Sequence, residues 1–205
     1  MSEIRWVVFD IGGVLLRWDP GVVYGPLLPD PDELAWFFAE VCTSEWNETI
    51  DAGRPREDAI AELSDRFPEH AHLVAQWRRQ DEMITGEVDG THGLVARLEA
   101  AGHPLYLLTN MPADDFAARR ARFDVLRHFD GWVVSGAEGV IKPSAEIFAL
   151  LTERFSLDPS ETLFVDDAER NVAGAAALGF RTHRFVDAAT LEADLLARGL
   201  LDASG

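Results

Sequence analysis

Cysteine and basic residues are both scarce in this chain. Cys42 is the single cysteine among 205 residues, which rules out an internal disulfide and fits a reducing compartment. Eighteen Lys and Arg residues stand against 36 Asp and Glu, for a formal net charge of −18. Such a charge repels polyanions such as nucleic acid and anionic membranes. We therefore expect neither as a partner.

Long apolar runs are also missing. No stretch approaches the roughly 20 apolar residues that a membrane helix needs. The amino-terminal segment MSEIR lacks the basic start and the apolar stretch of a signal peptide. These features favour a cytoplasmic protein.

What the sequence does contain is enough apolar material for one sizeable core. Hydrophobic residues make up 47% of the chain, with six Trp and twelve Phe. Composition therefore gives no reason to expect disorder. The length favours a single domain that carries a small insertion.

Short apolar runs alternate with helical patterns along most of the chain. The predicted strands are Ile4–Phe9, Pro104–Leu108, Gly131–Val134, Ser160–Val165 and Arg181–Phe185. The predicted helices are Thr91–Ala101, Ala113–Phe123, Ser144–Phe155, Glu169–Leu178 and Ala188–Ala197. This alternation predicts an α/β fold built on a Rossmann-like, doubly wound parallel sheet.

Residues from about 20 to 88 have a different pattern. Helical periodicity occurs over Asp32–Cys42, Arg56–Phe67 and Glu69–Met83, without a convincing strand. We predict that residues 18–88 form a small helical insertion, and that residues 1–17 and 89–205 form the α/β core.

Polar residues follow three of the predicted strands directly. Asp10, Thr109-Asn110 and Asp166-Asp167 stand where parallel strands end, which is where open α/β sheets bind ligands. Each residue alone could be a turn former or a helix cap. Together with Lys142, they favour a functional site.

Carboxylates gathered at one sheet edge repel each other unless a cation lies between them. Oxygen ligands select a hard ion, so Mg²⁺ is the expected cofactor. With Mg²⁺ and Lys142 present, Asp10 could stay ionised beside a phosphate group and attack it. Thr109 and nearby backbone amides would hold the transferring oxygens.

Four motifs occur in a characteristic order, namely VVFDIGGVLL, LLTN, IKP and FVDDAERNVAGAAALG. In this order they resemble the haloacid dehalogenase (HAD) superfamily over nearly the whole chain. The resemblance implies that Asp10 is the nucleophile and a metal ligand, and that Thr109 binds phosphate. It also implies that Lys142 neutralises nucleophile and phosphate, and that Asp167 ligates the metal. Asp166 would support the metal directly or through water.

The resemblance extends to the helical insertion, which matches the family's cap over the active site. Asn110 is expected as a further phosphate-binding residue and Asn171 as a neighbour, although either could be only a supporting or cap residue. Typical phosphatases of the family carry a second Asp two residues after the nucleophile, as general acid and base, where this chain has Gly12. Gly12 can offer its backbone carbonyl to Mg²⁺ but cannot move a proton. Loss of such a group removes a factor of roughly 10²–10⁴.

The first motif, the DD pair and the short cap most resemble the sugar-phosphatase branch that includes bacterial α-glucose-1-phosphate phosphatase. Candidate replacements for the missing acid lie in the insertion at Glu45, Glu48, Asp51 and Arg54, with Trp46 as a possible pocket wall. Taken singly, each of the four is better explained as part of a solvated loop, although the segment as a whole is the expected determinant of substrate specificity.

The resulting prediction is a Mg²⁺-dependent phosphomonoester hydrolase acting on a small phosphorylated metabolite, such as a sugar phosphate. One alternative is a metal-independent 2-haloacid dehalogenase. The other is a degenerate domain that binds a phosphorylated ligand without turnover. The sequence leaves the substrate and the oligomeric state open.

Overall fold

A five-stranded, all-parallel sheet forms the centre of the protein in a computed structural model that describes residues 3–202. The strand order is β5-β4-β1-β6-β7. The strands are β1 (Trp6–Phe9), β4 (Leu105–Thr109), β5 (Gly131–Val134), β6 (Thr162–Asp166) and β7 (Arg181–Arg184). All five predicted strands are therefore present, with ends shifted by at most two residues. The predicted parallel α/β sheet is confirmed.

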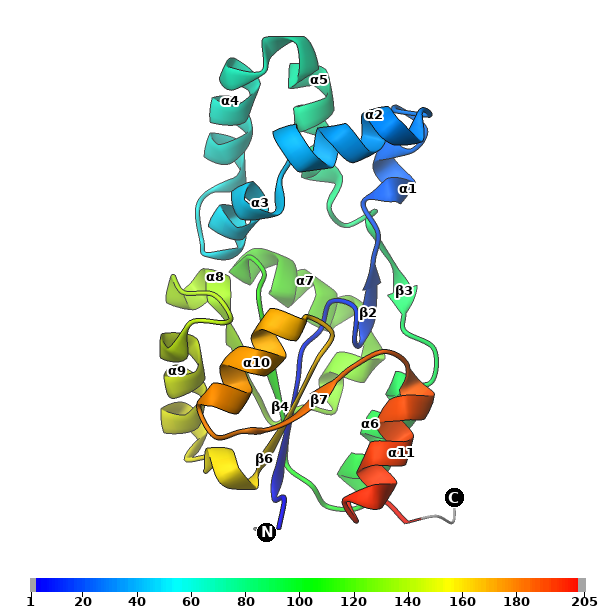
Figure 1. Cartoon of the computed structure of the whole chain (residues 1–205), viewed down its shortest axis with the longest axis vertical. Helices are drawn as coiled ribbons and strands as arrows, with labels where there is room; N and C mark the ends of the chain where they lie inside the picture. The colour runs from blue at the N-terminus through cyan, green and yellow to red at the C-terminus, as the bar shows by residue number, and fades with distance from the viewer. Residues whose placement is uncertain (1–2, 203–205) are drawn as a thin grey trace.

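Helices cover both faces of the sheet (Figure 1). Side chains of a strand alternate between the two faces, so Val7 and Phe9 belong to one apolar cluster and Val8 to another. The first cluster includes α6 (Thr91–Ala100), α7 (Ala113–Arg122) and α11 (Ala188–Ala197). The second includes α9 (Ala145–Phe155) and α10 (Glu169–Ala177). Burial on both faces explains why the central strands are almost continuously apolar.

Local capping signals set several of these helix ends. The Ser144 side chain accepts a hydrogen bond from the backbone of Glu146 at the start of α9. Asp187 does the same for Thr190 at the start of α11. Two short helices, α8 (Ser135–Glu138) and η4 (Asp124–Arg127), flank β5.

A group of short helices lies apart from the sheet, at one end of the molecule in Figure 1. It has its own apolar cluster, centred on Tyr24, Phe37 and Trp77. Its elements are α1 (Gly21–Tyr24), α2 (Pro31–Trp36), η1 (Phe37–Val41), α3 (Ser44–Asp51), α4 (Arg56–Arg66), η2 (Pro68–His70), α5 (Ala71–Val74) and η3 (Ala75–Arg79). Within residues 3–202, none of the helices has the length and apolar character needed to cross a membrane.

Two of the helices predicted here are broken into pieces. The segment Glu69–Met83 forms 3₁₀, α and 3₁₀ turns in succession, and α2 passes into a π-helical turn at Phe37. Apolar periodicity does not distinguish these helical forms over a few residues, because the repeat of each differs from that of the α-helix by less than one residue per turn.

The expectation that residues 20–88 contain no strand was wrong. β3 (Ile84–Glu87) pairs antiparallel with β2 (Leu16–Trp18), and this ribbon joins the helical part to the sheet (Figure 1). The strand is short, and Gly86, at φ +141°, interrupts its apolar pattern. Its partner is also distant in sequence, so no local signal indicated the pairing.

Candidate functional site

Three neighbouring strands bring the predicted residues together at one edge of the sheet. Asp10 directly follows β1, Thr109 ends β4 and Asp166 ends β6. Because β1 lies between β4 and β6 and all three are parallel, their carboxyl ends are adjacent. Asp10, Thr109 and Asp166 are each more than nine-tenths buried.

Lys142 lies between two of the carboxylates. Its Nζ is 2.8 Å from Oδ1 of Asp10 and 2.7 Å from Oδ2 of Asp166, and the residue is 1% exposed. It is also the only lysine in the sequence. This ammonium therefore links the strand ends of β1 and β6.

The side chain of Asn110 holds the backbone of Lys142. The Lys142 N–H donates to Asn110 Oδ1 at 2.8 Å, and Asn110 Nδ2 donates to the Lys142 carbonyl at 3.1 Å. The amide group is thus engaged on both sides in this structure. It positions the lysine loop, rather than pointing free donors at a ligand.

Asp166 is fully buried and surrounded by donors. The Ala168 N–H donates to its Oδ1 at 2.9 Å, and Asn171 Nδ2 lies 3.0 and 3.1 Å from its two oxygens. With Lys142 on Oδ2, both oxygens have partners. Asn171 therefore adjoins the site, as expected, by orienting Asp166.

Asp167 points toward the first-motif loop instead. It is exposed, and its carboxylate lies directly against Gly13, which has φ +72°. Asp10, Asp166 and Asp167 each present an oxygen within 4.8 Å of the others. The fourth-motif pair thus divides into one buried carboxylate and one that faces the cavity.

Burial and mutual repulsion dominate the electrostatics of these groups. Burial raises the pKa of Asp10 to about 7, against the opposing charge of Lys142. Burial and the charge of Asp166 also raise the pKa of Asp167. Burial alone would lower the pKa of Lys142, but the charges of Asp10 and Asp166 outweigh it and raise that pKa.

This donor set suits a divalent cation. Three carboxylates gather here and one ammonium bridges two of them, so the fully ionised cluster carries excess negative charge in a largely buried place. A hard cation with oxygen ligands would relieve that repulsion and lower the pKa values of Asp10 and Asp167. Asp10 and Asp167 have the accessible oxygens, whereas those of Asp166 are already occupied.

A cavity of about 470 Å³ opens above the cluster, between the sheet edge and the helical part. Asp10, Gly12, Gly13, Thr109, Lys142 and Asp167 line its floor. On the opposite side it is lined by Trp18, Phe38, Cys42, Asn47, Glu48, Asp51, Trp77 and Gln80. Both parts of the chain therefore contribute to one pocket.

Of the predicted residues in the helical part, Glu48 and Asp51 line this cavity, and Glu45, Trp46 and Arg54 are not among its lining residues. Trp46 instead donates its indole N–H to the Ala59 carbonyl at 3.3 Å. Trp18, Trp77 and Asn47 were missed by sequence reasoning. A pattern of buried helical residues gives no signal for which of them face a pocket.

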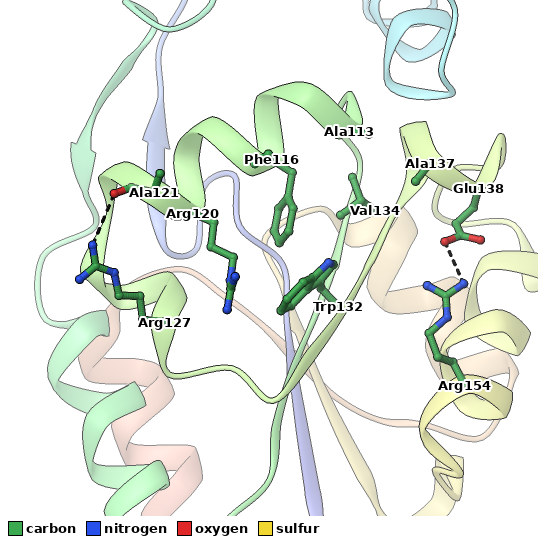
Figure 2. Close-up of a pocket in the computed structure, with 11 residues that line it drawn as sticks. Ala113, Phe116, Arg120, Ala121, Arg127, Trp132, Val134, Ala137, Glu138 and Arg154 are labelled. Carbon is green, nitrogen blue, oxygen red and sulfur yellow. Dashed lines mark hydrogen bonds and ion pairs between the residues drawn. The ribbon is translucent and has the colours of Figure 1, made fainter.

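A second cavity, of about 700 Å³, lies at the outer edge of the sheet (Figure 2). Its walls come from α7, η4, β5, α8 and α9, and Phe116 packs on Trp132 inside it at a ring separation of 5.5 Å. None of the clustered carboxylates lines it. Its size alone therefore does not make it the reactive site.

Comparison with known proteins gives a consistent result. A family model described as haloacid dehalogenase-like hydrolase matches residues 4–179. A sesquiterpene phosphatase of Aspergillus oryzae is 29% identical over 87% of this chain and 88% of its own length. The phosphoglycolate phosphatase of Escherichia coli K12 is 27% identical over 87% of this chain and 79% of its own.

Solved structures share the fold. A HAD-like family hydrolase from Porphyromonas gingivalis superposes with a TM-score of 0.72 at 22% identity, covering 95% of this chain and 98% of its own. A HAD family enzyme from Bacteroides thetaiotaomicron, solved with magnesium and inorganic phosphate, superposes with a TM-score of 0.65 at 20% identity. The match covers 90% of this chain and 95% of that enzyme.

Proposed function

The chain belongs to the haloacid dehalogenase-like hydrolases and is a phosphatase-type enzyme, and from this premise we propose that it hydrolyses phosphomonoesters with Mg²⁺ through an aspartyl-phosphate on Asp10. The observation that carries the proposal is the cluster of Asp10, Asp166 and Asp167 around Lys142. Its excess negative charge requires a cation before an anionic substrate can approach.

The relatives support the same reaction class. The fungal and bacterial relatives are both phosphatases, and the Bacteroides enzyme was crystallised with magnesium and inorganic phosphate. In this chain Asp10 and Asp167 would hold the ion, with the Gly12 carbonyl as a further ligand. Bound there, Mg²⁺ would neutralise charge on the phosphoryl oxygens.

Asp10 would act as the nucleophile. Its free carboxylate oxygen attacks phosphorus, while Lys142 holds the other oxygen and orients the group. Thr109, at the end of β4, would place its hydroxyl on the transferring oxygens. Asn110 and Asp166 would act by fixing Lys142, from its backbone and from its ammonium respectively.

The helical part, proposed as residues 18–88, would cap the substrate. Its ribbon connection, β2 and β3, leaves the helices α1 to α5 outside the sheet. Ion pairs nevertheless join the two parts, between Arg56 and Asp115 at 2.5 Å and between Arg170 and Glu48. A closed cap excludes water from the reacting phosphate.

The substrate would be a small phosphorylated metabolite. Aromatic walls from Trp18, Phe38 and Trp77 stand beside the polar side chains of Asn47 and Gln80. This mixture suits a substrate with both apolar and hydroxyl-bearing faces, such as a sugar phosphate.

The test is phosphate release from p-nitrophenyl phosphate and from a panel of sugar, alcohol and nucleotide phosphates, with Mg²⁺ and with EDTA. We expect release that requires the metal and is abolished in Asp10→Asn, which keeps the shape of the side chain. The absence of phosphate release from every substrate of the panel would contradict the proposal. Halide release from 2-chloropropionate in EDTA would then indicate the dehalogenase reaction, and ligand binding without turnover would indicate a degenerate domain.

A further inference from the structure

Position 12 cannot supply a proton. Gly12 has no side chain, and a Cβ built there meets nothing within 4 Å, so no neighbouring group fills the place. A phosphate ester with a poor leaving group nevertheless needs a proton on the departing oxygen. The donor must therefore come from another residue that lines the catalytic cavity.

Besides Asp10 and Asp167, three residues among the cavity's lining carry a carboxyl or a thiol, namely Cys42, Glu48 and Asp51. Burial raises the pKa of Cys42 to about 12, so its proton is held too tightly for exchange at neutral pH. The Glu48 carboxyl is already engaged in an ion pair with Arg170. Asp51 remains.

The backbone of Asp51 is anchored to the sheet domain close to the phosphate-binding loop. Asp51 ends α3, and its carbonyl accepts a hydrogen bond of 2.5 Å from Ser135 Oγ. The same oxygen of Ser135 accepts from the Met111 N–H at 2.9 Å. Met111 stands two residues after Thr109, so one hydroxyl connects Asp51 to the strand end that would hold phosphate.

The carboxyl group of Asp51 is also held in a defined orientation. Asn47 Nδ2 donates to its Oδ2 at 2.9 Å, and Asn47 Oδ1 accepts from the Trp77 indole at 3.1 Å. One carboxyl oxygen is therefore fixed by Asn47. For Oδ1, the described residues provide no hydrogen bond.

Charged groups of both signs surround this carboxyl. Arg119 and Asp115 approach from α7, Glu48 lies on α3 and Arg56 begins α4. Burial is the largest influence and raises the pKa of Asp51 to about 7, with Arg119 opposing it. The group can therefore hold and release a proton near neutral pH, which a general acid and base requires.

We propose that Asp51 is the general acid and base of the phosphatase reaction, supplied by the helical part in place of the residue missing at Gly12. In the first step the P–O bond to the leaving group breaks as Asp10 forms its bond to phosphorus. The bonding electron pair stays on the leaving oxygen, which takes the proton of the Asp51 carboxyl. In the second step water attacks phosphorus, its proton passes to the Asp51 carboxylate, and the Asp10–phosphorus bond breaks to release phosphate.

This inference rests on the proposed phosphatase function, and the nature of the leaving group tests it. p-Nitrophenolate can leave without being protonated, whereas an alkoxide leaving group needs a proton. In Asp51→Asn, which retains an oxygen that can accept from Asn47, kcat/KM for an alkyl phosphate should fall by roughly 10²–10⁴-fold. The value for p-nitrophenyl phosphate should fall by about tenfold or less, because that substrate does not use the acid.

Glu48→Gln is the matched control, since it removes the other carboxyl that α3 presents to the cavity. This variant should change kcat/KM for the two substrates by the same factor. The wild-type pH profile for the alkyl phosphate should also show a fall above a pKa near 7 that is absent from Asp51→Asn.

Equal losses on both substrates in Asp51→Asn, or no loss on either, would overturn the role of Asp51 and leave the phosphatase assignment standing. A wild-type protein that releases no phosphate from either substrate would overturn the proposed function, and this inference with it. Thermal unfolding of each variant separates a catalytic loss from a folding defect.

Discussion

Gly13 lies so close to Asp167 that a Cβ on Gly13 would be 2.3 Å from Oδ2 of that carboxylate. Gly13 also has φ +72°, a conformation that disfavours side chains. At the adjacent Gly12, by contrast, a Cβ meets nothing within 4 Å. The two glycines of the first motif therefore have different reasons to be glycine.

Gly13→Ala should displace Asp167 and reduce Mg²⁺-dependent turnover by about 100-fold, the usual cost of misplacing a reacting group by about 1 Å. Strain at a positive φ should add a loss of about 1–3 kcal/mol in the free energy of unfolding. Gly12→Ala is the matched control and should keep its stability and most of its activity. Steady-state kinetics measures turnover and urea unfolding measures stability. Similar losses of turnover and stability in the two variants would contradict the contact between Gly13 and Asp167.

The open space at Gly12 allows the opposite change. Gly12→Asp introduces the carboxyl that typical phosphatases of the family carry at this position. In the Asp51→Asn background it should restore alkyl phosphate hydrolysis by at least about tenfold, since a general acid contributes roughly 10²–10⁴-fold. Gly12→Asn, which cannot donate a carboxyl proton, should restore nothing. Equal recovery in both variants would show that the effect is not proton transfer.

Lys142→Met should destabilise the protein, because it leaves Asp10 and Asp166 buried without their counterion. We expect the free energy of unfolding to fall by about 3–5 kcal/mol at pH 8, and we expect turnover to be lost. The pKa of Asp10 is raised to about 7, so at pH 5 that group is protonated and the loss should be smaller. Urea unfolding at the two pH values measures this difference, and an equal loss at both would contradict it.

The pH dependence of stability should report on Asp51 separately. Its folded-state pKa is raised from 3.8 to about 7, so its contribution is most favourable below pH 4 and is lost as pH rises through 7. Asp51→Asn should therefore gain stability relative to the wild type between pH 4 and pH 8. The gain is at most about 4 kcal/mol, at 1.36 kcal/mol per pH unit. A difference that stays constant over this range would show that Asp51 is not desolvated.

The second cavity offers a negative control for the site. The Arg120 guanidinium carbon lies 4.3 Å from the centre of the Trp132 ring, at the outer edge of the sheet. Arg120→Ala should leave kcat/KM within about twofold, with a stability loss of about 0.5–1 kcal/mol from the missing cation–π contact. A large drop in turnover without unfolding would implicate this cavity in the reaction.

Local patterns in the sequence determined the alternation of strands and helices, and with it the parallel sheet. Asp10, Thr109 and Asp166 could be placed at one edge because each follows or ends an apolar strand. Parallel neighbours then leave little freedom in where those side chains gather. Lys142 was found by its motif, although no pattern indicated that it bridges two carboxylates.

Tertiary structure alone decided how the site is held and what closes it. Asn110 binds the Lys142 backbone across 32 positions, and Ser135 reaches the Asp51 carbonyl across 84. The ribbon of β2 and β3 likewise pairs segments on either side of the whole helical part. Such contacts depend on how distant segments pack. Periodicity reports only the side of an element on which a residue lies, and it carries no information about the partner that it meets there.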